Sequence, residues 1–132
     1  MSIADLIALL GEKLRFDSTY DEAGEEWVLN VHLENHRNQA VRVFAQEDGG
    51  VQFARFVTNI GSASEFNERK LRTALEMNAS LPHGTLAIFE GSLVMLTSLR
   101  LESDLSQAAE VVGYIVRTAD TYEKLLFGLD RA

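Results

Sequence analysis

Histidine is the residue type in this 132-residue chain best suited to metal binding or proton transfer, and there are three. His32 and His36 stand four positions apart, a spacing that on a helix would place both side chains on one face. The surrounding residues instead predict a strand end and a turn, where four residues span roughly 13 Å at about 3.3 Å each. That separation is too large for two ligands of one ion. We therefore expect no metal site and interpret both histidines as exposed.

The other residues that could act in catalysis lack the neighbours that catalysis needs. His83 follows Pro82, the only proline, in a predicted turn, and a histidine base requires an orienting partner and a nucleophile nearby. There is no cysteine, which excludes disulfides, thiolate metal sites and cysteine nucleophiles. The carboxylates between 17 and 26 are interpreted as a solvated loop, and those of Asp120 and Glu123 as an exposed helix face. We expect no catalytic residues and no enzyme activity.

Charge and glycine placement also argue against nucleic acid and nucleotide ligands. Gly49-Gly50 falls in a predicted hairpin turn and not between a strand and a helix, so it does not form a phosphate-binding loop. The 20 acidic and 12 basic residues give a net charge of −8, which repels phosphate backbones and anionic lipid headgroups. The basic group Arg69, Lys70 and Arg72 has acidic neighbours at helical spacing. We expect no nucleic-acid partner and no cofactor.

The amino terminus has no feature of a targeting segment. No basic residues precede its apolar run, and Asp5 interrupts that run. Leu6 to Leu10 is far shorter than the roughly 20 residues that span a bilayer. We expect a cytoplasmic protein without direct membrane insertion. The length suits a single domain over residues 1–132.

Hydrophobic periodicity predicts the first half of the fold. Apolar residues at three- and four-residue steps predict a helix from Ser2 to about Leu14, with Ser2 and Asp5 as a capping pair. The polar stretch from Phe16 to Glu26 is interpreted as a loop. Strict alternation then predicts strands over 27–34 and 41–46, and Asp48-Gly49-Gly50 predicts the turn into a third strand over 51–60.

The second half predicts two helices around a hairpin. The second helix is expected to run from a cap at Ser62 to about Ser80, followed by strands over 85–89 and 92–101. A stripe of apolar residues from Leu105 to Leu129 predicts a long final helix, which Asp104 with Gln107 opens. The fold class is therefore α+β, an antiparallel five-stranded sheet with three helices in the order α-β-β-β-α-β-β-α.

The predicted sheet carries more large apolar side chains than one small core requires. If the three helices cover one face, the other face is left with an apolar patch, and such patches mark partner sites or oligomer interfaces. We predict Val28, Phe44 and Phe56 as the partner contacts on that free face. The alternative, in which the helices divide between both faces and bury everything, stays open from the sequence.

Two segments carry a resemblance to known families. The run LRTALEMNASLPHGTLAIFEGSLVML from Leu71 to Leu96, and the ending from Ala119 to Glu123 with Leu125 and Leu126, resemble the middle helix, hairpin and closing helix of type III secretion chaperones and the related YbjN-like proteins. The stretch from Glu65 to Glu68 with Leu71-Arg72 also resembles a bacterial family associated with membrane-stress proteins of the phage-shock type.

The resemblance implies a function and an assembly. It implies a homodimer formed through the middle helix and the second hairpin, which here contribute Leu75, Met77, Val94 and Leu96. It implies a non-enzymatic, protein-binding module that captures apolar segments of a client protein. The alternative that it implies is a YbjN-like regulatory scaffold in a bacterial stress or signalling complex, whose partner would be a regulatory protein.

Overall fold

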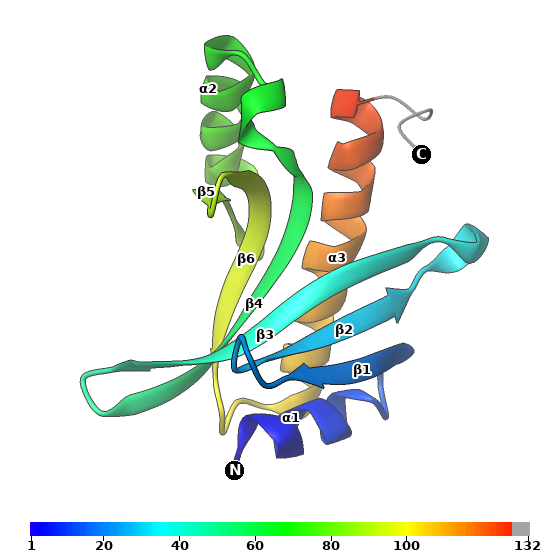
Figure 1. The fold of residues 1–132 in the computed structure, drawn as a ribbon, viewed down its shortest axis with the longest axis vertical. Helices are drawn as coiled ribbons and strands as arrows, with labels where there is room; N and C mark the ends of the chain where they lie inside the picture. Colours follow the sequence, from blue (N-terminus) through cyan, green and yellow to red (C-terminus); the bar gives the residue numbers. More distant parts are fainter. Residues whose placement is uncertain (128–132) are drawn as a thin grey trace.

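The computed structural model describes residues 1–127, which form three α-helices and six strands (Figure 1). Leu129, the last residue of the predicted apolar stripe, lies outside the described residues. The elements follow the order α1 (Ile3–Leu10), β1 (Phe16–Asp21), β2 (Glu26–His32), β3 (Asn38–Asp48), β4 (Val51–Ser62), α2 (Glu68–Met77), β5 (Thr85–Phe89), β6 (Ser92–Arg100) and α3 (Leu105–Phe127). The strands make one antiparallel sheet in the spatial order β1-β2-β3-β4-β6-β5.

The sheet has six strands, so the predicted count of five is wrong. The additional strand is β1, which lies in the stretch that the sequence predicts to be a loop. Its first residue, Phe16, is half-buried, and the other residues are exposed. An edge strand with solvent on both faces needs no alternation of apolar and polar residues, so the sequence pattern does not reveal it. Hydrogen bonds to β2 hold it, and Tyr20 adds an edge-on ring contact with Trp27 at 5.2 Å.

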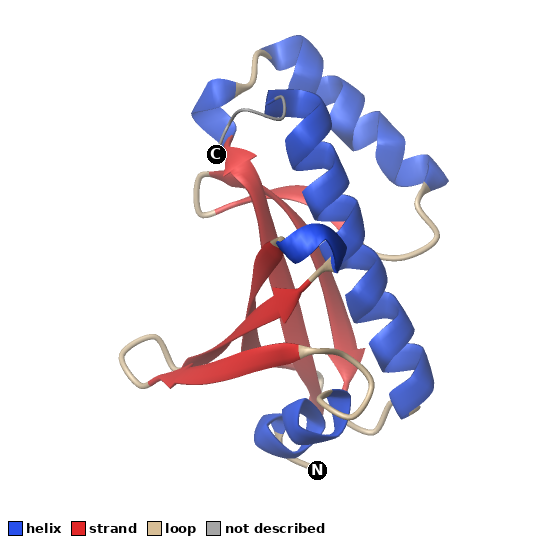
Figure 2. Ribbon diagram, turned by 90° about the vertical axis from the view of Figure 1, so that its right-hand side faces the viewer, coloured by secondary structure: helices blue, strands red, loops and turns tan. Residues whose placement is uncertain are grey.

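All three helices lie on one side of the sheet (Figure 2). We call this side the covered face and the other side the open face. The covered face supplies Leu29, Val43 and Phe56, none of which is exposed, and they pack in one core with Val112 and Ile115 of α3. The core therefore lies between the sheet and α3, as expected for a sheet with helices on one side.

Several local signals in the sequence are confirmed. The Ser2 side chain accepts from the Asp5 amide at 3.1 Å, and the Asp5 carboxylate accepts from the Ser2 amide at 3.0 Å, which completes a capping box. Gly49 and Gly50 adopt the positive φ values of +57° and +82° that a two-residue hairpin turn requires. Asp104 caps α3 by accepting from the Gln107 amide at 3.0 Å.

The predicted start of the second helix is wrong by five residues. β4 continues to Ser62, and Ala63–Glu65 then forms a single 3-10 turn. Asn67 is the true cap of α2, because its side chain accepts a hydrogen bond from the Lys70 amide at 2.8 Å. α2 is consequently a short helix, and it ends at Met77.

We predict opposite stability effects for two glycine-to-alanine substitutions. Gly84 has φ of +75°, and an added Cβ would lie 2.6 Å from Cγ2 of the fully buried Ile115, so Gly84→Ala should lower the free energy of unfolding by about 2–3 kcal/mol. Gly113 lies within α3, and its added Cβ would meet only the flexible Arg117 guanidinium within 3.4 Å. Gly113→Ala should therefore raise stability by up to about 1 kcal/mol. Urea denaturation measures the free energy of unfolding of both variants. Equal changes in the two variants would contradict the prediction.

Candidate protein-binding surfaces

A largely apolar groove lies between α2 and α3. It has a volume of about 360 Å³, and its floor and walls come from α2, the β5–β6 hairpin and the end of α3. We call it the α2–α3 groove. It is lined by Arg69, Lys70, Thr73, Ala74, Met77, Leu86, Leu93, Tyr122 and Leu125. Leu125 is 74% exposed on its rim.

The groove exists because α2 is held to the rest of the fold by few contacts. Ala74 is its only buried residue, and an alanine cannot fill the space out to α3. Asn78, directly after α2, fixes the end of the helix to β5: its side chain donates to the Leu86 carbonyl at 3.0 Å and accepts from the Leu86 amide at 2.7 Å. α2 is therefore anchored beside β5 and leaves an opening toward α3.

The polar groups of the groove are few, and the charged ones are basic. Arg69 and Lys70 line it from α2, and no carboxylate is among the lining residues. Burial, assisted by the nearby Tyr114, raises the pKa of the Tyr122 phenol, so Tyr122 is uncharged at neutral pH. The groove therefore offers an apolar wall with two cations along one side.

The open face of the sheet holds two of the three predicted partner contacts. Val28 and Phe44 lie on this face and are half-buried. Phe56 lies on the covered face and is 0% exposed, so it does not share the surface predicted for it. The register explains the difference: Phe56 pairs with Val43, and residues that pair across strands point to the same face.

Arg42 covers the centre of the open face. Its guanidinium carbon lies 5.9 Å from the Phe44 ring centre and 5.7 Å from that of Phe89, and these two rings stack at 6.1 Å. Its Nε donates to Glu26 at 2.9 Å and its Nη1 to Glu90 at 2.7 Å. The bond to Glu90 is the largest of the effects that raise the pKa of Arg42. We call this group the Arg42 clasp.

The Arg42 clasp hides much of the apolar surface predicted for the open face. Val57 and Val94 point to this side of the sheet, yet they are only 3% and 2% exposed. They line a hollow of about 240 Å³ together with Arg42 and Phe89. The chain therefore covers these side chains itself, and the free apolar surface of the open face is smaller than the sequence suggests.

The four predicted dimer contacts do not form one patch on the single chain. Leu75 is 58% exposed on α2, and Met77 lies in the α2–α3 groove. Val94 and Leu96 lie on the open face, where Val94 is buried and Leu96 half-buried. The predicted interface stays a prediction, and Leu75 is the one member that is fully open to a partner.

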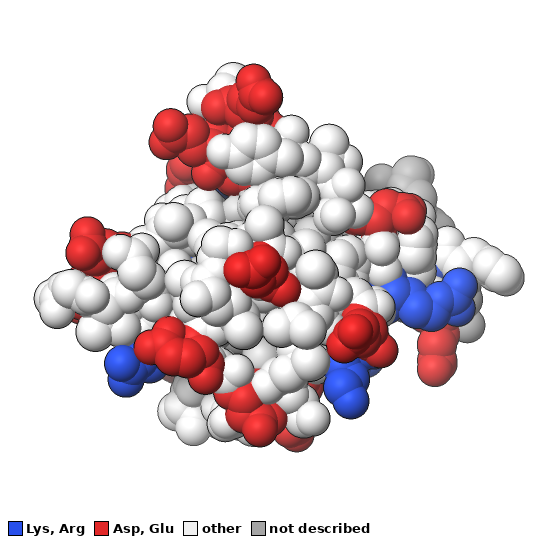
Figure 3. All heavy atoms as spheres, turned by 90° about the horizontal axis from the view of Figure 1, so that it is seen from below, with Lys and Arg blue, Asp and Glu red and all other residues white. Residues whose placement is uncertain are grey.

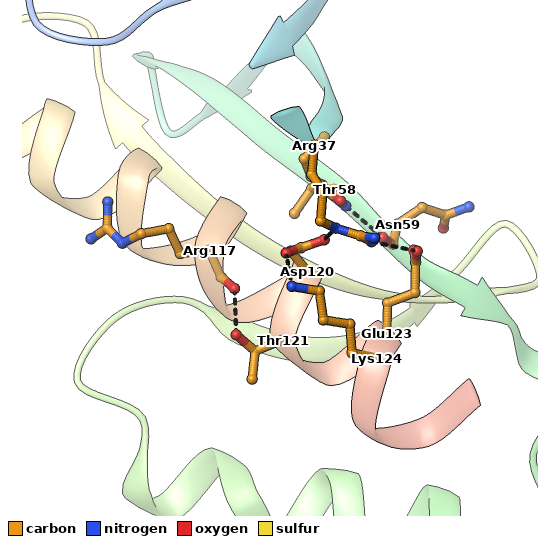
Figure 4. Close-up of polar contacts among 9 residues, drawn as sticks. Arg37, Thr58, Asn59, Arg117, Asp120, Thr121, Glu123 and Lys124 are labelled. Carbon is orange, nitrogen blue, oxygen red and sulfur yellow. Dashed lines mark hydrogen bonds and ion pairs between the residues drawn. The ribbon is translucent and has the colours of Figure 1, made fainter. Parts of the chain in front are cut away.

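A second, more polar cleft lies where the β2–β3 connection meets α3, and an ion-pair network closes one side of it (Figure 4). Asp120 accepts from Arg37 Nε at 2.8 Å and pairs with Lys124 at 3.3 Å, while Arg37 also approaches Glu123 at 3.6 Å. Asp120 is 7% exposed, so the expectation of an exposed carboxylate is wrong for this residue. Arg37 precedes Asp120 by 83 positions, and no sequence pattern links the two.

The histidines are placed apart and make separate contacts. His32 bridges two neighbouring strands, with Nε2 at 3.1 Å from Asp17 and Nδ1 at 2.9 Å from Asn38. His36 ends a 3-10 turn, and the His83 ring packs edge-on against Tyr114 at 5.5 Å. Among the described residues, no three metal-binding side chains come together.

Charge on the surface is mixed but mostly acidic. Figure 3 shows the lower end of the molecule, where separate acidic groups are spread among uncharged side chains and basic groups are fewer. This distribution agrees with the net charge of −8. Across residues 1–127, no helix is long and apolar enough to cross a bilayer.

Comparison with known proteins identifies the fold. No family model and no curated protein sequence matches the chain. A solved structure does match: a chain from the HopA1–SchA chaperone–effector complex superposes with a TM-score of 0.58 over 94% of this chain and 98% of that one. The two chains therefore share a fold. At 10% sequence identity the likeness establishes the fold alone, and the YbjN-like branch stays a prediction.

We predict that the Arg42 clasp stabilises the fold. Arg42→Ala removes the partner of Glu26, whose side chain is only 12% exposed, and uncovers Val57 and Val94. The free energy of unfolding, measured in urea, should fall by about 1–2 kcal/mol. This value allows for the partial exposure of the Arg42–Glu26 ion pair, which weakens it. The control is Arg55→Ala on the same face, because Arg55 donates only to a serine, Ser98. A loss no greater than that of Arg55→Ala would contradict the role of the clasp.

Proposed function

We propose that this chain is a non-enzymatic, chaperone-like binding protein that captures an apolar segment of another polypeptide in the α2–α3 groove. The observation that carries the proposal is the groove itself, an apolar channel that opens to solvent beside the 74%-exposed Leu125. The chaperone-like fold supports it. We also propose that the protein acts in the cytoplasm and as a homodimer.

The chemistry of the groove favours a polypeptide over a small molecule. Small-molecule sites bury most of the surface of their ligand and fix its orientation with a few precisely placed polar groups. The α2–α3 groove instead opens to solvent beside Leu125, and its polar side chains lie along α2 and at Tyr122. A helix-in-groove interaction uses this arrangement, in which large side chains of the ligand enter an apolar channel between two helices. Each fully buried large side chain contributes about 1.5–3 kcal/mol.

The open face is the less favourable of the two surfaces. The sequence predicts Val28 and Phe44 as client contacts, but the Arg42 clasp covers the strands next to Phe44. A client on this face would have to displace two ion pairs from Arg42. We therefore propose the α2–α3 groove, and not the open face around Val28 and Phe44, as the capture site.

We predict that a photo-crosslinking amino acid in place of Thr73, an exposed residue of the groove, traps a client polypeptide in native lysate. Leu125→Glu should reduce that product at least tenfold, because it places a charge where an apolar side chain must be buried. Phe44→Asp is the matched control on the open face and should leave the product unchanged. Mass spectrometry identifies the trapped chain. Loss of the product in Phe44→Asp but not in Leu125→Glu would contradict the assignment.

We predict that Leu75 contributes to the dimer. Leu75 lies two positions before Met77, so it points to nearly the opposite side of α2 from the groove, at about 100° per residue. The wild-type mass by light scattering should be twice the 14.7 kDa of one chain, and Leu75→Glu should shift it toward 14.7 kDa. Leu125→Glu serves as the control and should remain dimeric. A wild-type chain that elutes as a monomer at micromolar concentration would refute the dimer.

A further inference from the structure

The charges beside the α2–α3 groove differ from those of the chain as a whole. The net charge is −8, yet the two charged side chains that line the groove, Arg69 and Lys70, are both cationic. From these charges we infer that the groove takes an acidic amphipathic segment, with apolar side chains in the channel and carboxylates against Arg69 and Lys70. This inference rests on the proposed function and specifies the chemistry of the client.

Arg69 and Lys70 have no partner of their own within residues 1–127. Their side chains make no ion pair there, whereas Arg72 on the same helix approaches Glu68 at 3.7 Å. Lys124, the cation near the end of α3, is likewise neutralised by Asp120 at 3.3 Å. The side chains of Arg69 and Lys70 are therefore free to pair with carboxylates from outside the described chain.

The positions along α2 define the orientation of the ligand. Arg69 and Lys70 lie in the first turn of α2, directly after the Asn67 cap, and Met77 lies at its last residue. Seven residues of helix separate Lys70 from Met77 by roughly 10 Å at 1.5 Å per residue. The helix dipole adds partial positive charge at the same end. A bound segment would thus place its carboxylates near the start of α2 and its apolar anchor about 10 Å away, near Met77 and Leu86.

The expected preference for acidic ligands is small because Arg69 and Lys70 are exposed. Arg69 and Lys70 are exposed, so each ion pair with a ligand is weak in water and is screened by salt. Two such pairs should favour an acidic over a neutral ligand by about threefold to tenfold. A basic ligand, which is repelled by both cations, should bind more weakly than the neutral one. These ratios should shrink as ionic strength rises.

Three labelled peptides test the inference. They share one amphipathic helical sequence with leucines on one face and differ only at four positions on the other, which are all Glu, all Gln or all Lys. Fluorescence anisotropy against the full chain should give the affinity order Glu, Gln, Lys. The double variant Arg69→Glu/Lys70→Glu should reverse that order. Arg72→Glu is the matched control, because Arg72 does not line the groove, and it should preserve the order.

The remaining outcomes would contradict the inference, the proposed function or both. Equal binding of all three peptides, or tightest binding of the Lys peptide, would overturn the acidic specificity and leave capture of apolar segments intact. Absence of binding by any of them would overturn both the inference and the proposed function. If the double variant changed the mass measured by light scattering, the groove would be an interface with a second copy, and the inference would fail. Unchanged circular dichroism of the variants confirms that they fold.

Discussion

The one-sided packing of the helices on the sheet is the constraint on which the rest of this structure depends. With α1, α2 and α3 all on the covered face, the core forms between the sheet and α3. The open face must then be made compatible with water by the side chains of the strands themselves. Arg42 meets this requirement, because it bridges Glu26 and Glu90 while it lies over Phe44 and Phe89. One cation thereby covers apolar side chains that a second layer of helices would otherwise cover.

The same constraint accounts for the α2–α3 groove. α3 is long and occupies the middle of the covered face, so α2 has only the β5 end of the sheet on which to pack. Ala74 makes that contact without filling the space toward α3, and Met77 and Leu125 remain beside the opening. A groove of this kind needs no dedicated loops or catalytic groups. It arises from a short helix that packs against the sheet edge through a small residue.

The sequence predicts the elements of this fold better than it predicts their contacts. The caps at Ser2 and Asp104 and the turn at Gly49-Gly50 are local signals, and each is confirmed. β1 was missed because a polar edge strand has the composition of a loop. The sequence predicts Phe56 on the same face as Phe44, and this is wrong. Alternation shows which residues of one strand share a face, but it does not give the register between strands. A slip of one residue in that register moves every side chain of a strand to the opposite face.

The site was less predictable than the fold, since its residues meet only after folding. The α2–α3 groove joins residues from positions 69 to 125, and the prediction of a partner site on the open face did not include it. The sequence predicts a helix from a cap at Ser62 to about Ser80, yet no pattern within it indicates how closely the helix approaches α3. The Arg42 clasp was equally hidden, because Glu90 lies 48 positions from Arg42 along the chain.

The double hydrogen bond between Asn78 and Leu86 has a consequence for aggregation. The side-chain amide of Asn78 hydrogen-bonds to both the N–H and the C=O of Leu86 on the outer edge of β5. The backbone of an additional strand would form the same two bonds. The next backbone groups that point outward belong to Ile88, so the exposed row on this edge is too short to template a growing fibril. The β5 edge of the sheet is thereby protected from pairing with strands of other chains.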